Sequence, residues 1–271
     1  MMRIGCMLAL YLAIAHSVGW PQTVKPVFVG MELIEAKCTS TVDGSVALSG
    51  LRVDLGRLTV NVLDSYSILG RGRSFTGFSL RELASSVRVL AIINGGATAS
   101  FSTPVPVGLL VTQGRVVSKL ASKSKSLSGV LCLDGTTASV LGIALYNPSK
   151  CNSAVQAGPI VVEGGRNVIG RSERSALGAY QRSLAALDGS GRLFLMTTSK
   201  VHLYELAQCL VKELKQLDIR DVLNLDGDTS SGLVIAAPGS TRREIGSTTS
   251  LVASAIAVLP PRAAARPSKQ R

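Results

Sequence analysis

Short apolar runs separated by glycines and polar turns recur along most of the chain and predict a structure rich in strands. Residues 51–55 and 58–63 partly alternate between apolar and polar side chains. A hairpin is predicted for 107–111 and 115–117, because Gln113-Gly114 suits a tight turn. The same pattern predicts further strands at 46–48, 87–93, 130–133, 139–145, 160–162, 222–225 and 233–236.

Two stretches show helical spacing instead. Ser79 and Glu82 form a capping-box sequence, which predicts a helix over about 80–87. Leucines recur every three or four residues through 203–217, and this spacing predicts a second helix. Many strands with two helices indicate an α+β fold, in which a mixed, mostly antiparallel twisted sheet carries a few flanking helices.

The two ends of the chain differ from the rest. Arg3 is followed by an apolar run of about a dozen residues, which suits a signal peptide over residues 1–19 and is short for a membrane span of about 20. An uncleaved membrane anchor is the alternative. Residues 259–271 are rich in Pro, Ala and basic side chains and predict a disordered tail. We therefore expect a secreted or periplasmic protein with no transmembrane segment once the signal is removed.

Four cysteines remain after residue 19, namely Cys38, Cys132, Cys151 and Cys209. Four cysteines allow three complete pairings, and in an oxidising compartment we expect at least one disulfide. They form no C-x-x-C pair or Cys/His cluster of the kind that binds zinc.

The charge balance points to an anionic partner. Lys and Arg number 29 against 17 Asp and Glu, for a net charge of +12. Nucleic acid, an anionic cell surface or a phosphorylated substrate would each fit this excess. Aromatic residues make up only 4%, which argues against single-stranded nucleic acid, because bases stack on aromatic rings. We expect no nucleic-acid partner.

The stretch from Asp221 to Ile235 is the most suggestive of chemistry. Asp226 follows a short buried strand and precedes a loop of small residues, so a ligand can approach the backbone there. A polar hairpin turn explains the same residues, because Asp-Gly favours turns. His16 and His202 are the only histidines, which disfavours a Ser-His-Asp hydrolase. The sequence contains no dinucleotide-binding or Walker motif.

Four motifs together resemble the phosphodiester glycosidase family. They are Ile92-Ile93-Asn94-Gly95-Gly96, Gln156-Ala157-Gly158-Pro159, Arg174-Ser175-Ala176-Leu177-Gly178 and Asn224-Leu225-Asp226-Gly227 with Ser230-Ser231. The resemblance covers about residues 28–258 and implies a single domain. Two positions depart from the family pattern: Ala97-Thr98-Ala99 replace aromatic residues, and Asp228-Thr229 replace two glycines.

The resemblance implies a hydrolase that cleaves a sugar from a sugar-1-phosphodiester. The substrate would be an N-acetylglucosamine-1-phosphate-like group or a related envelope or exopolysaccharide glycan. Asp226 would be the principal carboxylate and Arg174 the phosphate clamp, with Arg166 or Arg171 contributing to phosphate binding. The expected substrate-binding residues are Asn94, Gly95, Gly96, Gln156, Gly158, Asn224, Gly227, Asp228, Ser230 and Ser231.

This chemistry agrees with what the residues offer. Glycosidic cleavage passes through an oxocarbenium-like state that carboxylates serve. A phosphate leaving group needs little protonation, so a cationic arginine replaces part of the general-acid work. Asp228, Glu163, Glu205 and Asp54 are the candidates for a second carboxylate, and the sequence does not choose among them.

Three other interpretations compete with the glycosidase hypothesis. Asp226-Gly227-Asp228 resembles the strand end of haloacid-dehalogenase phosphatases, which open a doubly wound domain and use Mg²⁺. The same residues fit the start of a calcium loop, but its twelfth position would fall on Ala237, which has no ligand atom in its side chain. A non-catalytic envelope protein that binds anionic glycans is the third. We expect no cofactor, with a divalent cation left open.

Overall fold

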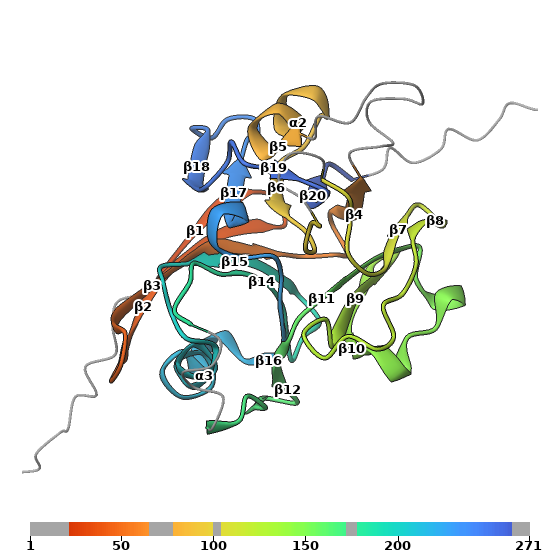
Figure 1. The fold of residues 1–271 in the computed structure, drawn as a ribbon. Coiled ribbons are helices and arrows are strands. Elements are labelled where there is room, and N and C mark those ends of the chain that lie inside the picture. Colours follow the sequence, from red (N-terminus) through yellow and green to blue (C-terminus); the bar gives the residue numbers. More distant parts are fainter. Residues whose placement is uncertain (1–21, 65–77, 100–103, 172–177, 262–271) are drawn as a thin grey trace, which may run out of the picture.

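The computed structural model describes residues 22–64, 78–99, 104–171 and 178–261 of the chain (Figure 1). The expected signal peptide at 1–19 and Arg174 lie outside the described residues, and so does the expected tail beyond Pro261. The described chain folds into three antiparallel sheets and a two-stranded ladder.

The largest sheet has eight strands in the order β1-β2-β3-β15-β14-β16-β12-β13. The bounds of its strands are β1 Thr23–Phe28, β2 Met31–Ser40, β3 Gly44–Val53, β12 Ile160–Glu163, β13 Arg166–Asn167, β14 Ser183–Asp188, β15 Leu193–Thr198 and β16 Ile219–Asn224.

Two five-stranded sheets complete the architecture. One has the order β10-β9-β11-β7-β8, with β7 Leu110–Thr112, β8 Arg115–Ser118, β9 Gly129–Asp134, β10 Thr137–Gly142 and β11 Ser153–Ala157. The other has the order β18-β17-β6-β20-β4, with β4 Thr59–Asp64, β6 Ala91–Asn94, β17 Gly232–Ile235, β18 Arg243–Gly246 and β20 Ser254–Leu259. The two-stranded ladder joins β5 Phe78–Ser79 to β19 Leu251–Val252.

Two α-helices lie in the described part of the chain. α2 spans Leu80–Ser86 and begins with the predicted capping box, in which the Ser79 and Glu82 side chains each accept a hydrogen bond from the other residue's backbone N–H. α3 spans Leu203–Gln208. α2 covers one face of the sheet that contains β6 and β17, whereas α3 covers the outer face of the eight-stranded sheet (Figure 1).

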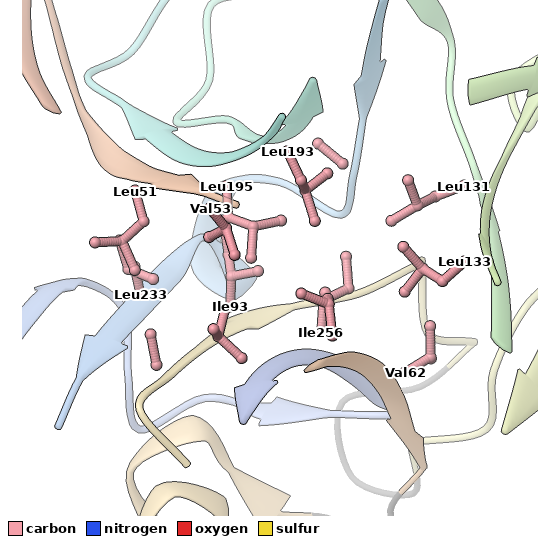
Figure 2. Packing of buried hydrophobic residues seen from close by; sticks show 14 of the residues in the cluster. Leu51, Val53, Val62, Ile93, Leu131, Leu133, Leu193, Leu195, Leu233 and Ile256 are labelled. Atoms are coloured by element: carbon pink, nitrogen blue, oxygen red, sulfur yellow. The ribbon is translucent and has the colours of Figure 1, made fainter. Parts of the chain in front are cut away.

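The central core lies where the three sheets face one another. It contains Leu51, Leu195, Ile93, Leu233 and Leu131, which come from all three sheets (Figure 2). Each of these side chains is at most 1% exposed. The hydrophobic effect that buries this layer therefore holds the three sheets together.

The strands β14 and β15 are buried on both faces. Ala185 and Leu195 point into the central core, whereas their neighbours Leu184 and Met196 pack against α3. A strand buried on both faces reads as a continuous apolar run without alternation, which is why the sequence pattern predicted neither strand.

The predicted α+β class overstates the helical content, because the described chain is mainly strand and its helices are short. The sheets of the described residues are wholly antiparallel rather than mixed. The predicted helix over 203–217 is α-helical only to Gln208. It continues as a π-helix over Cys209–Glu213 and a 3₁₀ turn over Lys215–Leu217. The leucines remain buried on one face throughout, so their spacing was correct although the hydrogen-bond type changes.

Two predicted strands are shorter than expected. β6 begins at Ala91 rather than near residue 87, because Val87 caps the C-terminus of α2. β10 ends at Gly142, and Ile143–Leu145 form a 3₁₀ turn. The predicted hairpin of β7 and β8 is confirmed, with Gln113 and Gly114 both at positive φ.

The expectation of at least one disulfide is confirmed by two. Cys38–Cys209 links β2 to the end of α3 across 171 residues of sequence, and Cys132–Cys151 links β9 to the start of β11. Two disulfides are consistent with an extracellular or periplasmic protein, because such bonds persist in oxidising compartments. None of the described helices is long and apolar enough to span a bilayer.

Candidate active site

Asn94 ties together four segments at the junction of two sheets. It is the last residue of β6 and is fully buried. Its Oδ1 accepts hydrogen bonds from Ser183 Oγ on β14 at 2.6 Å and from Gly232 N on β17 at 3.2 Å. Its Nδ2 donates to the carbonyl oxygen of Asp226 at 2.8 Å. One amide therefore positions the loop that carries the candidate catalytic carboxylate.

The backbone makes the same connection. Asp226 N donates to Gly95 O at 3.0 Å, and Gly95 N donates to Ser254 O at 2.9 Å. The loop after β6 and the loop after β16 are thus joined directly, although 132 residues separate Asn94 from Asp226. The sequence predicted both strand-end loops, and the structure brings them together.

The Asp226 carboxyl group is partly buried, and this burial raises its pKa above the ordinary value of 3.8. A hydrogen bond from Ser230 and another from Gly227 N, at 3.0 Å to Oδ1, oppose that rise by stabilising the charged form. Ser230 is itself buried in the 3₁₀ turn Asp228–Ser230. A carboxyl group with a raised pKa and directed donors is the kind of group that acid–base catalysis uses.

Gln156 holds a neighbouring loop. Its side chain is fully buried on β11. Oε1 accepts from Leu109 N and Ala121 N, both at 2.9 Å, and Nε2 donates to Ala121 O at 3.1 Å and Leu127 O at 2.8 Å. The amide that the sequence offered to a substrate is therefore engaged by the protein backbone.

Gly96 allows these two parts of the site to approach each other. A Cβ atom added at Gly96 would lie 2.6 Å from the carbonyl oxygen of Gln156 and 3.0 Å from a Val155 methyl group. Those distances are shorter than a real Cβ contact, so only glycine fits where the β6 loop crosses β11. The Asn94-Gly95-Gly96 and Gln156-Ala157-Gly158 motifs consequently meet in space.

Asn224 ends β16 and connects it to the same region. Its Nδ2 donates to Gly158 O at 2.9 Å, and its backbone N donates to Pro159 O at 3.1 Å. Its Oδ1 is buried and accepts no hydrogen bond from the described residues. In contrast, the side-chain oxygens of Asn94 and Gln156 both accept hydrogen bonds.

The strand register separates the four candidates for a second carboxylate. Across the eight-stranded sheet, Val53 pairs with Leu193, Leu193 with Leu187, and Leu187 with Asp221. Asp54 follows Val53, so it lies at the Asp221 end of β16, away from Asn224. Glu163 lies at that same end, because Gly164 N donates to Asp221 Oδ1.

The other two candidates for the second carboxylate, Glu205 and Asp228, lie away from the Asp221 end of β16. Glu205 is buried on α3, where Ser40 Oγ donates to its Oε2 at 3.1 Å. Asp228 is exposed and has φ 53° in the loop that carries Asp226. Asp228 is therefore the one candidate of the four that shares a loop with Asp226.

Arg182 is a buried cation that the sequence analysis missed. It is 7% exposed and immediately precedes β14. Its guanidinium group donates to Gly178 O at 2.8 Å and Val201 O at 3.4 Å, and it lies 5.2 Å from the centroid of the Tyr180 ring. Burial lowers its pKa, and attraction to Tyr180, Asp228 and Asp43 opposes the shift. The only sequence signal was an arginine directly before an apolar run.

The segment that contains Arg182 lies against the Asp226 loop. Asp228 N donates to the carbonyl oxygen of Gln181 at 2.8 Å, and a Cβ atom at Gly227 would lie 4.0 Å from Arg182 Cδ. The Arg182 guanidinium bonds to the carbonyls of Gly178 and Val201, so it holds the segment before β14, whose Gln181 carbonyl binds Asp228 N.

The competing interpretations fare differently in the structure. His202 is the N-cap residue of α3, and its Nδ1 pairs with Asp43 Oδ1 at 2.6 Å. The doubly wound domain of the phosphatase hypothesis is absent from the described chain, where every strand pair is antiparallel. No three His, Cys, Asp or Glu side chains of the described ranges gather into a metal-binding group.

The fold and the joined loops define a β-rich protein with one partly buried carboxylate at the junction of two sheets. A sequence profile of the phosphodiester glycosidase family matches residues 87–259, which include both loops. The chain belongs to the phosphodiester glycosidase family, so the resemblance noted in the sequence is confirmed. No curated protein matches the chain.

Solved structures share the fold at low sequence identity. A hypothetical protein from Synechocystis is 14% identical with a TM-score of 0.64, and the match covers 88% of this chain and 63% of that one. The catalytic domain of zebrafish N-acetylglucosamine-1-phosphodiester alpha-N-acetylglucosaminidase, auto-inhibited by its pro-peptide, is 14% identical with a TM-score of 0.62. That match covers 89% of this chain and 88% of the zebrafish domain.

A putative exported protein from Burkholderia pseudomallei is 12% identical with a TM-score of 0.57, over 83% of this chain and 76% of that one. Identities this low show a common fold.

Replacing Asn94 by alanine should destabilise the protein by about 3 kcal/mol or more, because each buried partner left unbonded costs about 1–3 kcal/mol. Asn147→Ala is the matched control: Asn147 is exposed and caps a 3₁₀ turn through Ser149 N, so its loss should cost about 1 kcal/mol. Urea unfolding of both variants measures the difference. Equal losses would show that Asn94 does not tie the loops together.

Proposed function

We propose that this chain is an exported hydrolase that cleaves the glycosidic bond of a sugar-1-phosphodiester. The sugar is an N-acetylglucosamine-like unit or a related unit of an envelope or exopolysaccharide glycan. Family membership supports the reaction class. The observation that carries the proposal for this chain is the direct hydrogen bonding of the Asn94-Gly95 loop to Asp226, which brings two family motifs into one site.

Asp226 is the principal carboxylate in this proposal. A carboxylate stabilises the positive charge that develops at the anomeric carbon and can activate water or attack as a nucleophile. Its fixed backbone supports this role, since Asn94 holds the Asp226 carbonyl and Gly95 holds its N–H. Preorganisation of this kind avoids reorganisation in the transition state.

We assign the second carboxylate to Asp228 on the basis of its place in the same loop. Its exposure leaves the carboxyl group accessible to a substrate. Gly227, Ser230 and Ser231 complete the loop. Asn224 offers its unbonded Oδ1 to a sugar hydroxyl, whereas Asn94 and Gln156 act as supports for the loops.

Asp226→Asn should lower kcat about 10²-fold or more, as expected for a positioned acid–base or nucleophilic group. Asp221→Asn, on the other end of the same strand, should leave kcat nearly unchanged. Steady-state kinetics on a sugar-1-phosphodiester compares the two. Asp221 is partly exposed and accepts a hydrogen bond from Gly164 N, so it controls for loss of one carboxylate on β16.

The pH dependence of kcat/KM distinguishes a catalytic role of Asp226 from an effect of the substitution on folding. If the ionised Asp226 is the active form, the acid limb of kcat/KM lies above the ordinary value of 3.8, because burial raises the pKa. Ser230→Ala removes a hydrogen bond that lowers this pKa, so the limb should move to still higher pH. A limb that stays in place, or full activity in Asp226→Asn, would remove Asp226 from the mechanism.

Glycan binding by an inactive wild-type protein would instead favour the interpretation as a non-catalytic glycan-binding protein.

Arg174 is the phosphate clamp in this proposal, on the basis of its sequence motif alone. Arg174→Ala should reduce kcat/KM for a sugar-1-phosphodiester by about ten- to a hundred-fold, the range of a charge-assisted hydrogen bond. A neutral nitrophenyl glycoside of the same sugar should be affected far less. Arg174→Lys should also reduce kcat/KM, because the planar guanidinium group that binds two phosphate oxygens is lost.

The exposed Lys123 provides the control, and Lys123→Ala should affect rates only at low salt. Equal losses on both substrates would make Arg174 a structural residue.

A further inference from the structure

The central core changes from apolar to polar side chains at the end of the eight-stranded sheet that carries the Asp226 loop. On β3 the inner face reads Val53, Leu51 and then Ser49, and on β15 it reads Leu195 and then Thr197. Ser49 and Thr197 are direct strand partners, as are Leu51 and Leu195. The layer that is apolar in the middle of the molecule therefore ends in hydroxyl groups.

A cavity of about 190 Å³ occupies this end of the layer. Its volume corresponds to about six water molecules at about 30 Å³ each, so it accommodates one small group rather than an oligosaccharide. None of the residues that the structure places around it has a charged side chain. Its polar lining consists of Ser49, Gln181, Thr197, Thr198, Ser199 and Ser231.

Ser231 connects this cavity to the candidate active site. Its backbone is fixed, because its N donates to Asp228 O at 3.1 Å and its O accepts from Ser247 N at 2.7 Å. Gly246 has φ 71° and lies so close to Ser231 O that a Cβ atom there would clash. The Ser231 loop therefore cannot shift without breaking these contacts, and it belongs to the same turn as Asp228.

The hydroxyl group of Ser231 lacks a partner. Ser231 is 1% exposed, and its Oγ has no hydrogen bond within the described residues. A buried polar group left unbonded carries a free-energy cost. A ligand that bonds to this hydroxyl, which can turn about a single torsion, recovers that cost. The remaining lining favours an uncharged ligand.

The other hydroxyls offer both donors and acceptors. Ser199 Oγ accepts from Ala47 N at 3.0 Å, which leaves its own hydrogen available. Thr197 Oγ1 donates to Ser49 O at 3.3 Å, which leaves its lone pairs available. Mixed neutral donors and acceptors match the hydroxyls of a sugar or polyol. A phosphate would lack a positive partner here.

We propose that this cavity, the Ser49–Thr197–Ser231 pocket, binds one neutral hydroxylated group of the substrate, a sugar ring or polyol of the aglycone beyond the phosphate. The position of the pocket in the reaction depends on the proposed function. Its preference for a neutral polyol over an anion depends only on its lining.

Two substrates with the same glycosyl-1-phosphate and different aglycones test the pocket. One carries a methyl aglycone and the other a glucosyl aglycone. Wild-type protein should prefer the glucosyl diester in kcat/KM. Ser49→Leu, which fills the pocket, should reduce that preference by about ten-fold, equivalent to about 1.4 kcal/mol, and should leave turnover of the methyl diester unchanged. Ser45→Leu is the matched control, because Ser45 is exposed on the same strand and face but outside the pocket.

A binding measurement keeps the proposal testable if neither diester is turned over. Methyl α-glucoside should shift the backbone amide signals of Ser49, Thr197 and Ser231 in NMR spectra of the wild-type protein, and Ser49→Leu should abolish the shifts. Inorganic phosphate should leave these signals in place. Binding without hydrolysis would uphold the pocket and defeat the proposed function. Hydrolysis with an unchanged aglycone preference in Ser49→Leu, or stronger shifts with phosphate, would overturn the pocket.

Discussion

The site depends on a single buried amide. Asn94 accepts from Ser183 and Gly232 and donates to Asp226, so it joins strands of two sheets to the loop that carries the carboxylate. Fully buried hydrogen bonds of this kind are strongly directional, and their partners cannot turn to water if the amide is lost. The position of Asp226 is therefore set from inside the protein, before any substrate arrives.

The three facing sheets explain why the site lies where it does. Apolar side chains fill the layer between them and fix the strand ends, and the loops after β6 and β16 meet at one end of that layer. The same end carries the hydroxyl-lined pocket beside Ser231. Burial raises the pKa of Asp226 while Ser230 and Gly227 restrain the rise, so a partly buried carboxyl group and a polar pocket share one loop.

The sequence predicted many of the strands, both inside the sheets and at their edges, but not all of them. The alternating strands, the α2 capping box and the β7–β8 hairpin were predictable from local patterns. β14 and β15 were missed because they are buried on both faces and show no alternation. The site motifs were visible, but the direction of their side chains was not: Gln156 faces a backbone loop. Arg182 was missed because a lone arginine before an apolar run carries no pattern.

The most direct test of the proposed activity is the position of bond cleavage. Hydrolysis of a sugar-1-phosphodiester in ¹⁸O-labelled water, followed by mass spectrometry of both products, shows which atom receives the water oxygen. A glycosidase that works through Asp226 breaks the bond between the anomeric carbon and oxygen, so the label should appear in the released sugar and the phosphomonoester should remain unlabelled. Label in the phosphate would show cleavage at phosphorus and would contradict the account.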